Sequence, residues 1–364
     1  MTVEPFGELA VALSDSAVRA VFADPRFSRS ATFTGGGTTL NAGMGQWGAS
    51  GMDGPEHLAI RRGLSAGATA EVLVAKRQEF EDLADRLIAT VCSGDGHFEL
   101  NAAIAEPFAV QCLGIILGTD LGDPRRLRRA VDATVAIEGA EAEELEHAVR
   151  TLTMVCLRAA AGGAAGQNGD GLIPRMLQQL GDDRATRRLI AHNVLPYVVG
   201  GIENPFVAIG ASLIGLLESA EARTTVRAEP ERVAAVVDEL LRLHPTGLMS
   251  FARAPMEDVE LAGVTIAAGT PVVPMIGPAN RDPVRYENPD TFSLARPPSR
   301  HLSFGWGPHF CVGEQLGRLQ LELLLPRLVR RLPGLRLSVQ RSELVKRTGH
   351  IVDGYDPIPL AWGR

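Results

Sequence analysis

Cys311 is the residue whose type and setting could most directly carry chemistry. The amphipathic run from Glu314 to Leu332 predicts a helix, so Cys311 lies just before a helix N-terminus. Unpaired N–H groups and the positive end of the helix dipole favour a thiolate there, and a thiolate can bind iron. On residue type alone, a small buried hydrophobic side chain is the simpler interpretation. Glycine and proline predict an irregular loop before the helix, Phe304-Gly305-Trp306-Gly307-Pro308-His309-Phe310-Cys311-Val312-Gly313.

Two pairs of charged residues occur at helical spacing. Glu239 and Arg242 are three positions apart in a predicted helix from Glu231 to Leu243, so they share a face and can form an ion pair. On a surface such a pair contributes roughly a few tenths of a kcal/mol, which leaves an ordinary surface pair as the simpler interpretation. His57 and Arg61 are four positions apart. Such a cationic pair can bind a carboxylate or belong to a solvated basic face.

Paired glycines, Gly200 and Gly201, interrupt the most apolar part of the chain. Without side chains, the backbone there can lie close to a flat ligand. Pro205 has no N–H to donate to the carbonyl of Gly201, so a kink or groove is expected. The alternative is that glycine and proline at these positions only let helices cross in the core.

Composition limits the classes of function. The 364 residues carry 36 Lys and Arg against 43 Asp and Glu, a net charge of −7, and 45% are hydrophobic. The chain can therefore bury a large core, and its acidity gives no support for binding to nucleic acid. Four cysteines lie far apart without a Cys-x-x-Cys pair, which argues against a disulfide framework or a zinc ribbon. They are Cys92, Cys112, Cys156 and Cys311.

The longest apolar stretches run from Leu189 to Ile202 and from Asn204 to Leu217. Each is shorter than the roughly 20 residues that a bilayer span needs, and we interpret them as buried helix separated by Glu203. The segment from Met1 to Gly7 lacks the apolar run of a signal peptide. We therefore expect a cytoplasmic protein without a membrane span.

Helical periodicity dominates from Ser14 to Leu337, and strand patterns are short, so a mainly α fold with small β-sheets is expected. The clearest predicted helices are Val72 to Cys92, Arg125 to Ala136, Glu141 to Ala161, Arg184 to Leu195 and Glu231 to Leu243. The predicted strands are Leu9 to Leu13, Val259 to Ile266 with a turn at Ala262-Gly263, and Pro271 to Ile276, with further pieces between Leu335 and Leu360.

The loop that contains Cys311 resembles the haem-binding loop of the cytochrome P450 family, in its soluble bacterial form. This resemblance implies an α-rich triangular prism that holds haem b. It makes Cys311 the thiolate ligand of the iron, and His309 would bond a haem propionate. The family's pattern of Phe, Gly, Gly, a basic residue, Cys and Gly is matched by Phe304, Gly305, Gly307, His309, Cys311 and Gly313.

Three sets of residues acquire roles by the same resemblance. One is the family's ExxR pair with a later arginine, which forms a buried network behind the haem loop. Another contacts the haem propionates. The third is the glycine pair of the distal helix, which lies over the iron. In that order the sets are Glu239, Arg242 and Arg296; His57, Arg61 and Arg253; and Gly200 and Gly201.

Glu203 occupies the acidic position of the family's acid–alcohol pair on the distal helix. The next residue in the family is usually threonine, whose hydroxyl helps to relay protons for oxygen activation, but here it is Asn204. An amide has no hydroxyl to relay a proton, although it can donate a hydrogen bond or hold a water. Oxygen activation is therefore expected to rely on an ordered water, on Glu203 or on a hydroxyl of the substrate.

Substrate contacts are expected, by family analogy, from the distal helix and two loops. The contributing side chains are mainly apolar, which favours an apolar or mixed-polarity organic molecule over a highly charged one. They are Ile202, Pro205, Met249, Ser250 and Ile351.

The resemblance runs from Leu9 to Leu360. The helix and first strand that precede this region in the family are missing, so a single P450-like domain from 1 to 364 with an unusually short N-terminus is expected.

The expected function is that of a monooxygenase that uses O2 and two electrons from a separate ferredoxin and ferredoxin reductase. Hydroxylation or epoxidation of a small organic secondary metabolite is the leading reaction, followed by oxidative coupling or cyclisation. The alternative is a haem-binding protein with little turnover. A basic patch could receive an acidic ferredoxin, and its members are Arg61, Arg62, Arg77 and Arg318. The sequence leaves the substrate and the oligomeric state open.

Overall fold

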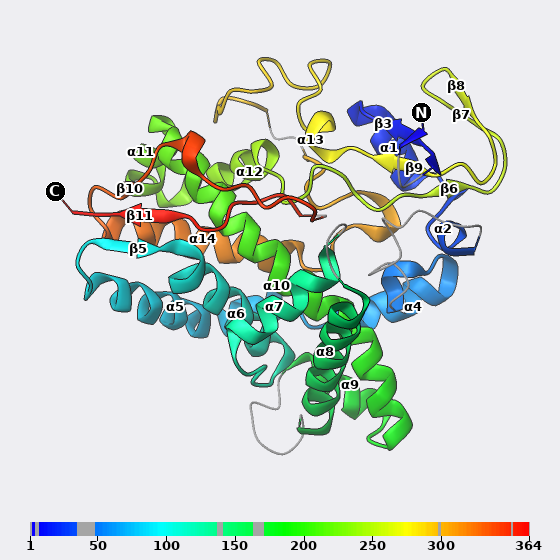
Figure 1. Cartoon of the computed structure of the whole chain (residues 1–364), viewed down its shortest axis with the longest axis horizontal. Helices are drawn as coiled ribbons and strands as arrows, with labels where there is room; N and C mark the ends of the chain where they lie inside the picture. Colours follow the sequence, from blue (N-terminus) through cyan, green and yellow to red (C-terminus); the bar gives the residue numbers. More distant parts are fainter. Residues whose placement is uncertain are drawn as a thin grey trace.

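Helices form most of the protein, and short sheets lie at its edges (Figure 1). The computed structural model describes residues 2–3, 7–34, 48–136, 141–162, 171–297, 300–350 and 352–363. Its main helices are α1 (Asp15–Ala23), α2 (Ala31–Thr34), α4 (Gly54–Ser65), α5 (Ala70–Cys92), α6 (Glu106–Leu117), α7 (Pro124–Val135), α8 (Ala142–Gly162), α9 (Leu172–Leu180), α10 (Arg184–Glu218), α11 (Ala220–Ala228), α12 (Val233–Leu243), α13 (Ile276–Ala279) and α14 (Glu314–Arg331).

The strands form small, separate sheets. The predicted hairpin is confirmed, and its turn residues Ala262 and Gly263 have positive φ angles of 50° and 78°. The antiparallel pairs are β1 (Thr2–Val3) with β2 (Gly7–Glu8), β4 (Phe27–Ser28) with β6 (Ala254–Pro255), and β7 (Val259–Leu261) with β8 (Val264–Ile266). Strand β3 (Ala10–Ala12) runs parallel to β9 (Val272–Pro274), and β11 (Pro359–Ala361) lies between β10 (Arg336–Leu337) and β5 (His97–Glu99).

The apolar stretches on either side of Glu203 belong to one helix, α10. Asp183 caps its N-terminus by accepting hydrogen bonds from the backbone of Ala185 and Thr186. Pro196 and Pro205 lie inside the helix without ending it, because tertiary burial outweighs the two missing backbone donors. By length and hydropathy α10 could span a membrane, but 72% of its apolar window is buried within the protein. We therefore describe α10 as a core helix.

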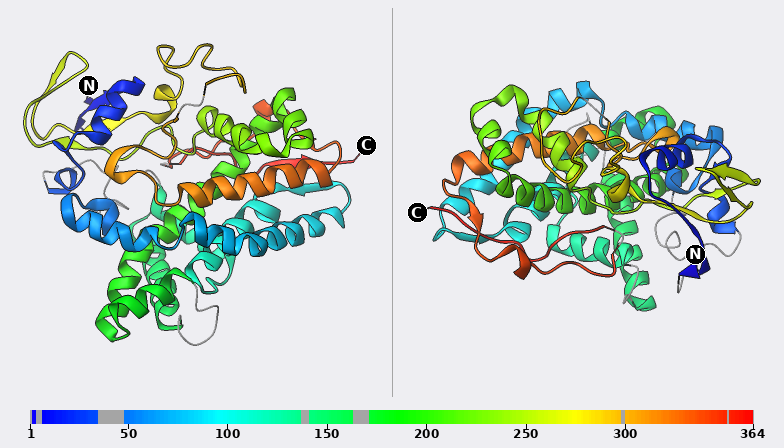
Figure 2. Two further views of the ribbon diagram at one scale, coloured as in Figure 1. Left: turned by 180° about the vertical axis from the view of Figure 1, so that it is seen from behind. Right: turned by 90° about the horizontal axis from the view of Figure 1, so that it is seen from above.

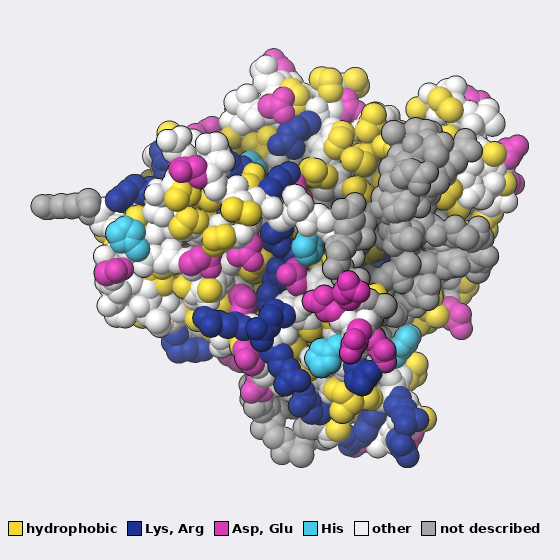
Figure 3. Space-filling view, viewed as in Figure 1, with side chains coloured by type: hydrophobic (Ala, Val, Ile, Leu, Met, Phe, Trp, Pro, Cys, Tyr) yellow, Lys and Arg dark blue, Asp and Glu magenta, His cyan; other side chains and the backbone are white. Residues whose placement is uncertain are grey.

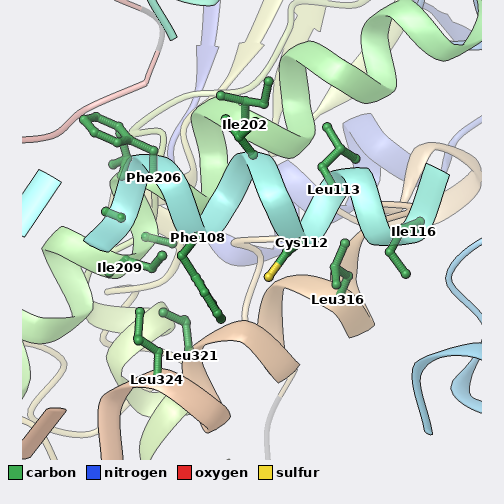
Figure 4. Packing of buried hydrophobic residues seen from close by; sticks show 14 of the residues in the cluster. Phe108, Cys112, Leu113, Ile116, Ile202, Phe206, Ile209, Leu316, Leu321 and Leu324 are labelled. Carbon is green, nitrogen blue, oxygen red and sulfur yellow. The ribbon is translucent and has the colours of Figure 1, made fainter. Parts of the chain in front are cut away.

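The core lies where α6, α10 and α14 meet (Figure 4). Phe108 and Cys112 of α6 point toward Leu321 and Leu316 of α14, and Ile202 of α10 lies on the opposite side of α6. In the views of Figure 2, α14 also runs alongside α5. The loop that carries Cys311 leads directly into α14, so burial of α14 against α5, α6 and α10 fixes the position of that loop.

Candidate functional site

The Cys311 loop is a compact turn that requires glycine. Gly305 and Gly307 have φ angles of 72° and 71°, which favour glycine. A Cβ on Gly307 would lie 2.5 Å from the carbonyl oxygen of Phe22, so no other residue fits there. The backbone N–H of Cys311 donates to the Phe304 carbonyl at 2.8 Å and closes the loop. The loop therefore presents one exposed thiol, that of Cys311, immediately before α14.

The structure corrects the expectation that the position of Cys311 before a helix is enough to make it a thiolate. Although the thiol is exposed, the surrounding protein excludes much of the bulk water, and this desolvation raises the pKa of Cys311. The N–H of Gly313 and the charge of Arg61 act in the opposite direction without cancelling the shift. The helix N-terminus alone thus does not produce a thiolate, and a bound cation would be needed to favour it.

Arg61 holds the backbone of the same loop. Its guanidinium donates to the carbonyl of Phe310, the residue next to Cys311. The predicted partner of Arg61, His57, is buried one turn earlier on α4 and stacks on His309 at a ring-centroid distance of 4.0 Å. Arg61 therefore lies against the thiol loop, whereas His57 lies with His309.

His57 and His309 belong to a buried group of basic side chains that includes Arg253. Burial lowers the pKa of His309 to about 4, and it lowers the pKa of Arg253 to about 10. Burial and the charge of Arg61 also lower the pKa of His57. The predicted residues His57, Arg253 and His309, which are far apart in the sequence, are thus brought together.

Arg29 joins this group, and the sequence analysis missed it. Its side chain is buried beside Phe251, with the guanidinium carbon 4.4 Å from the ring centroid. Burial and the like charge of Arg253 lower the pKa of Arg29 to about 9. The Nε of both arginines and the Nη2 of Arg29 have no hydrogen-bond partner among the described residues. Two buried guanidinium groups with free donors form a binding site for an anion.

Asp53 organises the same group. Its Oδ2 accepts hydrogen bonds from the Ser28 hydroxyl at 2.7 Å and from the backbone of Arg29 and Ser30 at 2.9 Å each. Its Oδ1 lies 3.3 Å from Nε2 of His309, and these hydrogen bonds hold the pKa of Asp53 well below its usual range. One carboxylate thus ties the Arg29 segment, the start of α4 and the Cys311 loop together. No sequence spacing indicated Asp53 or Arg29.

The glycine pair of α10 divides into two different roles. A Cβ on Gly200 would meet only the Nδ2 atom of Asn204, at 3.7 Å, so this position borders open space. A Cβ on Gly201 would lie 3.0 Å from the side chain of Leu113 on α6. Gly201 therefore serves helix packing, and its assignment to cofactor binding stays a prediction. Ile202 is fully buried in the core (Figure 4), so its expected contact with substrate is wrong.

Glu203 is directed away from the open face of α10. Its carboxylate is 1% exposed and forms ion pairs with Arg347 at 2.7 Å and with Arg128 on α7 at 3.1 Å. Asp132, which is partly exposed, pairs with the same two arginines and completes a charge network around Glu203. The two carboxylates and two guanidinium groups fix Glu203 in place, and the structure does not bring its carboxylate to the side of α10 where Asn204 lies.

Asn204 is exposed, and two hydrogen bonds fix its amide. Its Nδ2 donates to the carbonyl of Gly200 at 3.1 Å, and its Oδ1 accepts from the Thr246 hydroxyl at 3.1 Å. Thr246 precedes the predicted substrate residues Met249 and Ser250, which are partly exposed. Pro205 is also partly exposed, whereas Ile351 lies outside the described residues.

The ExxR residues form a buried network rather than a surface pair. Glu239 and Arg242 are joined by two hydrogen bonds of 2.8 Å, and Arg296 donates to Glu239 at 2.9 Å. Both arginines also donate to backbone carbonyls of the segment 287–291. A charge network with this many partners fixes the course of that segment.

Asn280 connects this network to the Cys311 loop. It donates to the Arg242 carbonyl at 3.2 Å and to the Ser303 hydroxyl at 2.8 Å, and it accepts from the backbone of Leu302 at 2.7 Å. Its side chain is completely buried. No local sequence pattern indicated Asn280, because its three side-chain contacts come from segments that are distant in the chain.

The predicted basic patch is partly neutralised. Arg77 pairs with Glu81 at 2.9 Å, and Arg318 pairs with Asp238 and Glu314. Arg62 is exposed. A separate basic surface lies along α7. Figure 3 shows its Lys and Arg side chains in the region that Figure 1 labels α6 and α7. Its exposed members on α7 are Arg125, Arg126 and Arg129.

Comparison with known proteins identifies the fold and its activity. The cytochrome P450 family model matches residues 181–334. Nocardicin C N-oxygenase of Nocardia uniformis subsp. tsuyamanensis is 33% identical over 350 residues, which cover 95% of this chain and 87% of that protein. The chain belongs to the cytochrome P450 family. Mycinamicin IV hydroxylase/epoxidase of Micromonospora griseorubida is 30% identical over 98% of this chain and 91% of that relative.

Solved structures agree with this assignment. The thaxtomin hydroxylase cytochrome P450 TxtC superposes with a TM-score of 0.87 at 29% identity, covering 98% of this chain and 94% of that one. SgvP, described as involved in the tailoring step of griseoviridin, superposes with a TM-score of 0.88 at 27% identity, covering 97% of this chain and 90% of that one. The protein is therefore a P450 monooxygenase, and membership of this family implies haem iron bound through a thiolate.

The residues present fit such a group. Cys311 offers an exposed sulfur, and Gly200 leaves open space on α10. The unpartnered donors of Arg29 and Arg253 match the carboxylates that a haem carries. A thiol, a glycine face and buried cations are the three elements that an anionic, planar iron cofactor requires.

Proposed function

We propose that this P450 holds haem b and hydroxylates or epoxidises a small organic secondary metabolite inside the cell, with electrons from a separate ferredoxin and ferredoxin reductase. The observation that carries the proposal is the exposed Cys311 thiol in a fixed loop, next to the buried guanidinium groups of Arg29 and Arg253, whose Nε donors have no hydrogen-bond partner among the described residues. The names of the relatives support oxidation of secondary metabolites, since they include an N-oxygenase and a hydroxylase/epoxidase.

Each part of the site has a separate task. Cys311 would bind the iron, Arg61 would hold the Phe310 carbonyl beside it, and Arg29 and Arg253 would bind the haem carboxylates. Bound haem iron supplies activation of dioxygen and transfer of one oxygen atom to the substrate. Gly200 leaves room on α10 for the flat cofactor.

Proton supply is the step in which this chain departs from the usual family pattern. Asn204 has no ionisable proton, and Glu203 is held by Arg128 and Arg347. The residues that remain near the open face of α10 can orient a water or a substrate hydroxyl but cannot relay a proton through position 204. Protons would therefore arrive through ordered water or through the substrate.

Oxidative coupling or ring closure is the second candidate reaction, because it depends less on rapid proton delivery. The replacement of threonine by Asn204 favours it. Among the relatives, biflaviolin synthase of Streptomyces coelicolor is 30% identical over 85% of this chain, and cytochrome P450mel 107F1 is described as having biaryl coupling reactivity.

Reconstitution tests the function. The purified holoenzyme is supplied with a ferredoxin, its reductase, NADPH and a panel of candidate metabolites that carry methyl, alkene and phenol groups. We expect products that gain one oxygen atom, or coupled products from the phenols, together with the reduced carbon monoxide band that gives the family its name. A Cys311→Ser variant should lose that band. Native protein that lacks the band, or whose iron is bound by an imidazole, contradicts the proposal.

A further inference from the structure

The open face of α10 carries one fixed polar pair, formed by Asn204 and Thr246. The Thr246 hydroxyl donates to Oδ1 of Asn204, and Nδ2 of Asn204 donates to the Gly200 carbonyl, at 3.1 Å each. The amide nitrogen must therefore point toward Gly200 and the amide oxygen toward Thr246, because the opposite orientation would place two acceptor oxygens together. Two partners thus determine one orientation of Asn204.

The backbone around Thr246 is rigid. Its carbonyl accepts from the N–H of Asp353 at 2.7 Å, which ties the turn to the C-terminal segment. The N–H of Gly277 donates to the Leu248 carbonyl at 3.0 Å, and the N–H of Ser250 donates to the Pro274 carbonyl at 2.9 Å. Three backbone bonds from separate segments hold the turn, so the Thr246 hydroxyl is preorganised rather than free to follow Asn204.

The pair retains unused hydrogen-bonding capacity. Asn204 has two N–H donors and uses one, while the Thr246 oxygen donates its proton and keeps its lone pairs. In the described part of the chain these groups have no further hydrogen-bond partner. Asn204 is exposed, and the residues before it, Ile202 and Glu203, are fully buried. The free donor therefore belongs to the face of α10 that also carries Gly200.

The neighbours of the pair on α10 are apolar. Pro205, which is partly exposed, follows Asn204, whereas Ala208, one turn later on the same side of α10, is buried. Leu248, which is 42% exposed, and Met249 follow Thr246 in the turn. A polar pair among mainly apolar neighbours can fix the orientation of a ligand, because an unpaired polar atom on either partner carries a cost.

We propose that Asn204 and Thr246 form a substrate-positioning pair that binds a hydrogen-bonding oxygen of the substrate, a carbonyl, ether or hydroxyl, beside the carbon that is oxidised. This inference rests on the proposed function and specifies its substrate class. Asn204 supplies the donor, and Thr246 is a positioning residue that acts through Asn204. A substrate hydroxyl at this place could also accept from Asn204 while its own proton remains available.

Carbon monoxide on the reduced haem is the first probe, because a nearby N–H donor lowers its C–O stretching frequency. We expect the infrared frequency to rise by several wavenumbers in Asn204→Leu and to rise or broaden in Thr246→Val. Thr246→Ser, which keeps the hydroxyl, should restore the native band. Thr265→Val, on the exposed β8 strand, is the matched control and should leave the band unchanged. Identical bands in native protein, Asn204→Leu and Thr246→Val would overturn the proposal.

Two ligands of the same shape, one with a carbonyl oxygen and one without it, test whether Asn204 and Thr246 recognise an oxygen acceptor. 2-Adamantanone carries a carbonyl where 2-methyleneadamantane carries a CH2 group, and both are titrated against the ferric holoenzyme by the spin-state change of the haem. We expect the ketone to bind at least about threefold more tightly to the native protein, with the preference lost in Asn204→Leu and reduced in Thr246→Val. Equal responses to the two ligands in all three proteins contradict the inference. Loss of the thiolate band in native protein would instead contradict the proposed function.

Discussion

The two sides of the site are built in different ways. On the side of Cys311, the loop is fixed by glycines, by Arg61 and by the connection through Asn280 to Glu239 and Arg242. On the side of Asn204, a few contacts from α10 and the Thr246 turn hold the polar groups. The many hydrogen bonds on the Cys311 side can present the same thiol whatever substrate is bound. The few contacts on the Asn204 side allow that side to differ between substrates.

The largest effect is expected from the buried charge network. Glu239→Gln would leave Arg242 and Arg296 buried without their carboxylate, which should lower the free energy of unfolding by about 3–5 kcal/mol. Haem content after purification should fall as the Cys311 loop loses its support. Thermal unfolding and the haem-to-protein absorbance ratio measure both effects. Glu229→Gln removes an exposed pair with Arg232 and is the control. Equal losses in the two variants would contradict the prediction.

A smaller effect is expected at Arg29, where stability and cofactor retention should separate. Arg29→Met removes donors to the haem carboxylates, so transfer of haem to apomyoglobin should accelerate about 10- to 100-fold. The apoprotein should be no less stable, because a buried repulsion with Arg253 is removed at the same time. Arg26→Met, at an exposed arginine on the same segment, is the control. Native-like haem retention in Arg29→Met would exclude Arg29 from the site.

The two glycines of α10 should respond differently to the same change. Gly201→Val is expected to lower the free energy of unfolding by about 1–3 kcal/mol, because the added carbons meet Leu113. Gly200→Val borders open space and should cost less in the apoprotein, while reducing haem binding. Chemical denaturation of the two apoproteins measures the comparison. Equal destabilisation would show that both glycines pack against α6.

The smallest effect expected is a pH dependence of stability, which comes from the charge network around Glu203. His350 lies 3.1 Å from Asp132, whose hydrogen bond raises the pKa of His350 against the opposing charge of Arg347. The His350–Asp132 pair therefore contributes its full stabilisation of the folded protein below pH 6.5, the ordinary pKa of histidine. This stabilisation is lost as the pH rises through the raised pKa of His350. It should remain under about 1 kcal/mol, because the pair is partly exposed.

Thermal unfolding of native protein and His350→Gln at pH 5.5 and 8.5 tests this dependence. The two proteins should differ at the lower pH and converge at the higher one. His97→Gln, at an exposed histidine of β5, should show no such convergence. A constant difference between native protein and His350→Gln across the range would contradict an ionised pair.

Local sequence patterns were sufficient for several of the elements and for the thiol loop. Helical periodicity predicted α5, α7, α8 and α14 to within two residues at each end, and alternation with a glycine turn predicted the β7–β8 hairpin. The exception was α10, where helical periodicity predicted a helix only from Arg184 to Leu195, whereas the helix continues through Glu203 to Glu218. A single charge can be buried inside a helix when partners from elsewhere neutralise it, and here Arg128 and Arg347 do so.

The sequence by itself determined that Cys311 is presented at the start of a helix, because glycine conformations and helical periodicity are properties of neighbouring residues. Only the tertiary structure decided that Arg29 faces Arg253, that Glu203 turns away from Asn204 and that Gly201 serves packing. These outcomes depend on which distant segments meet. Helical spacing gives the face of a helix, but the charge, space and hydrogen-bond partners on that face come from the rest of the fold.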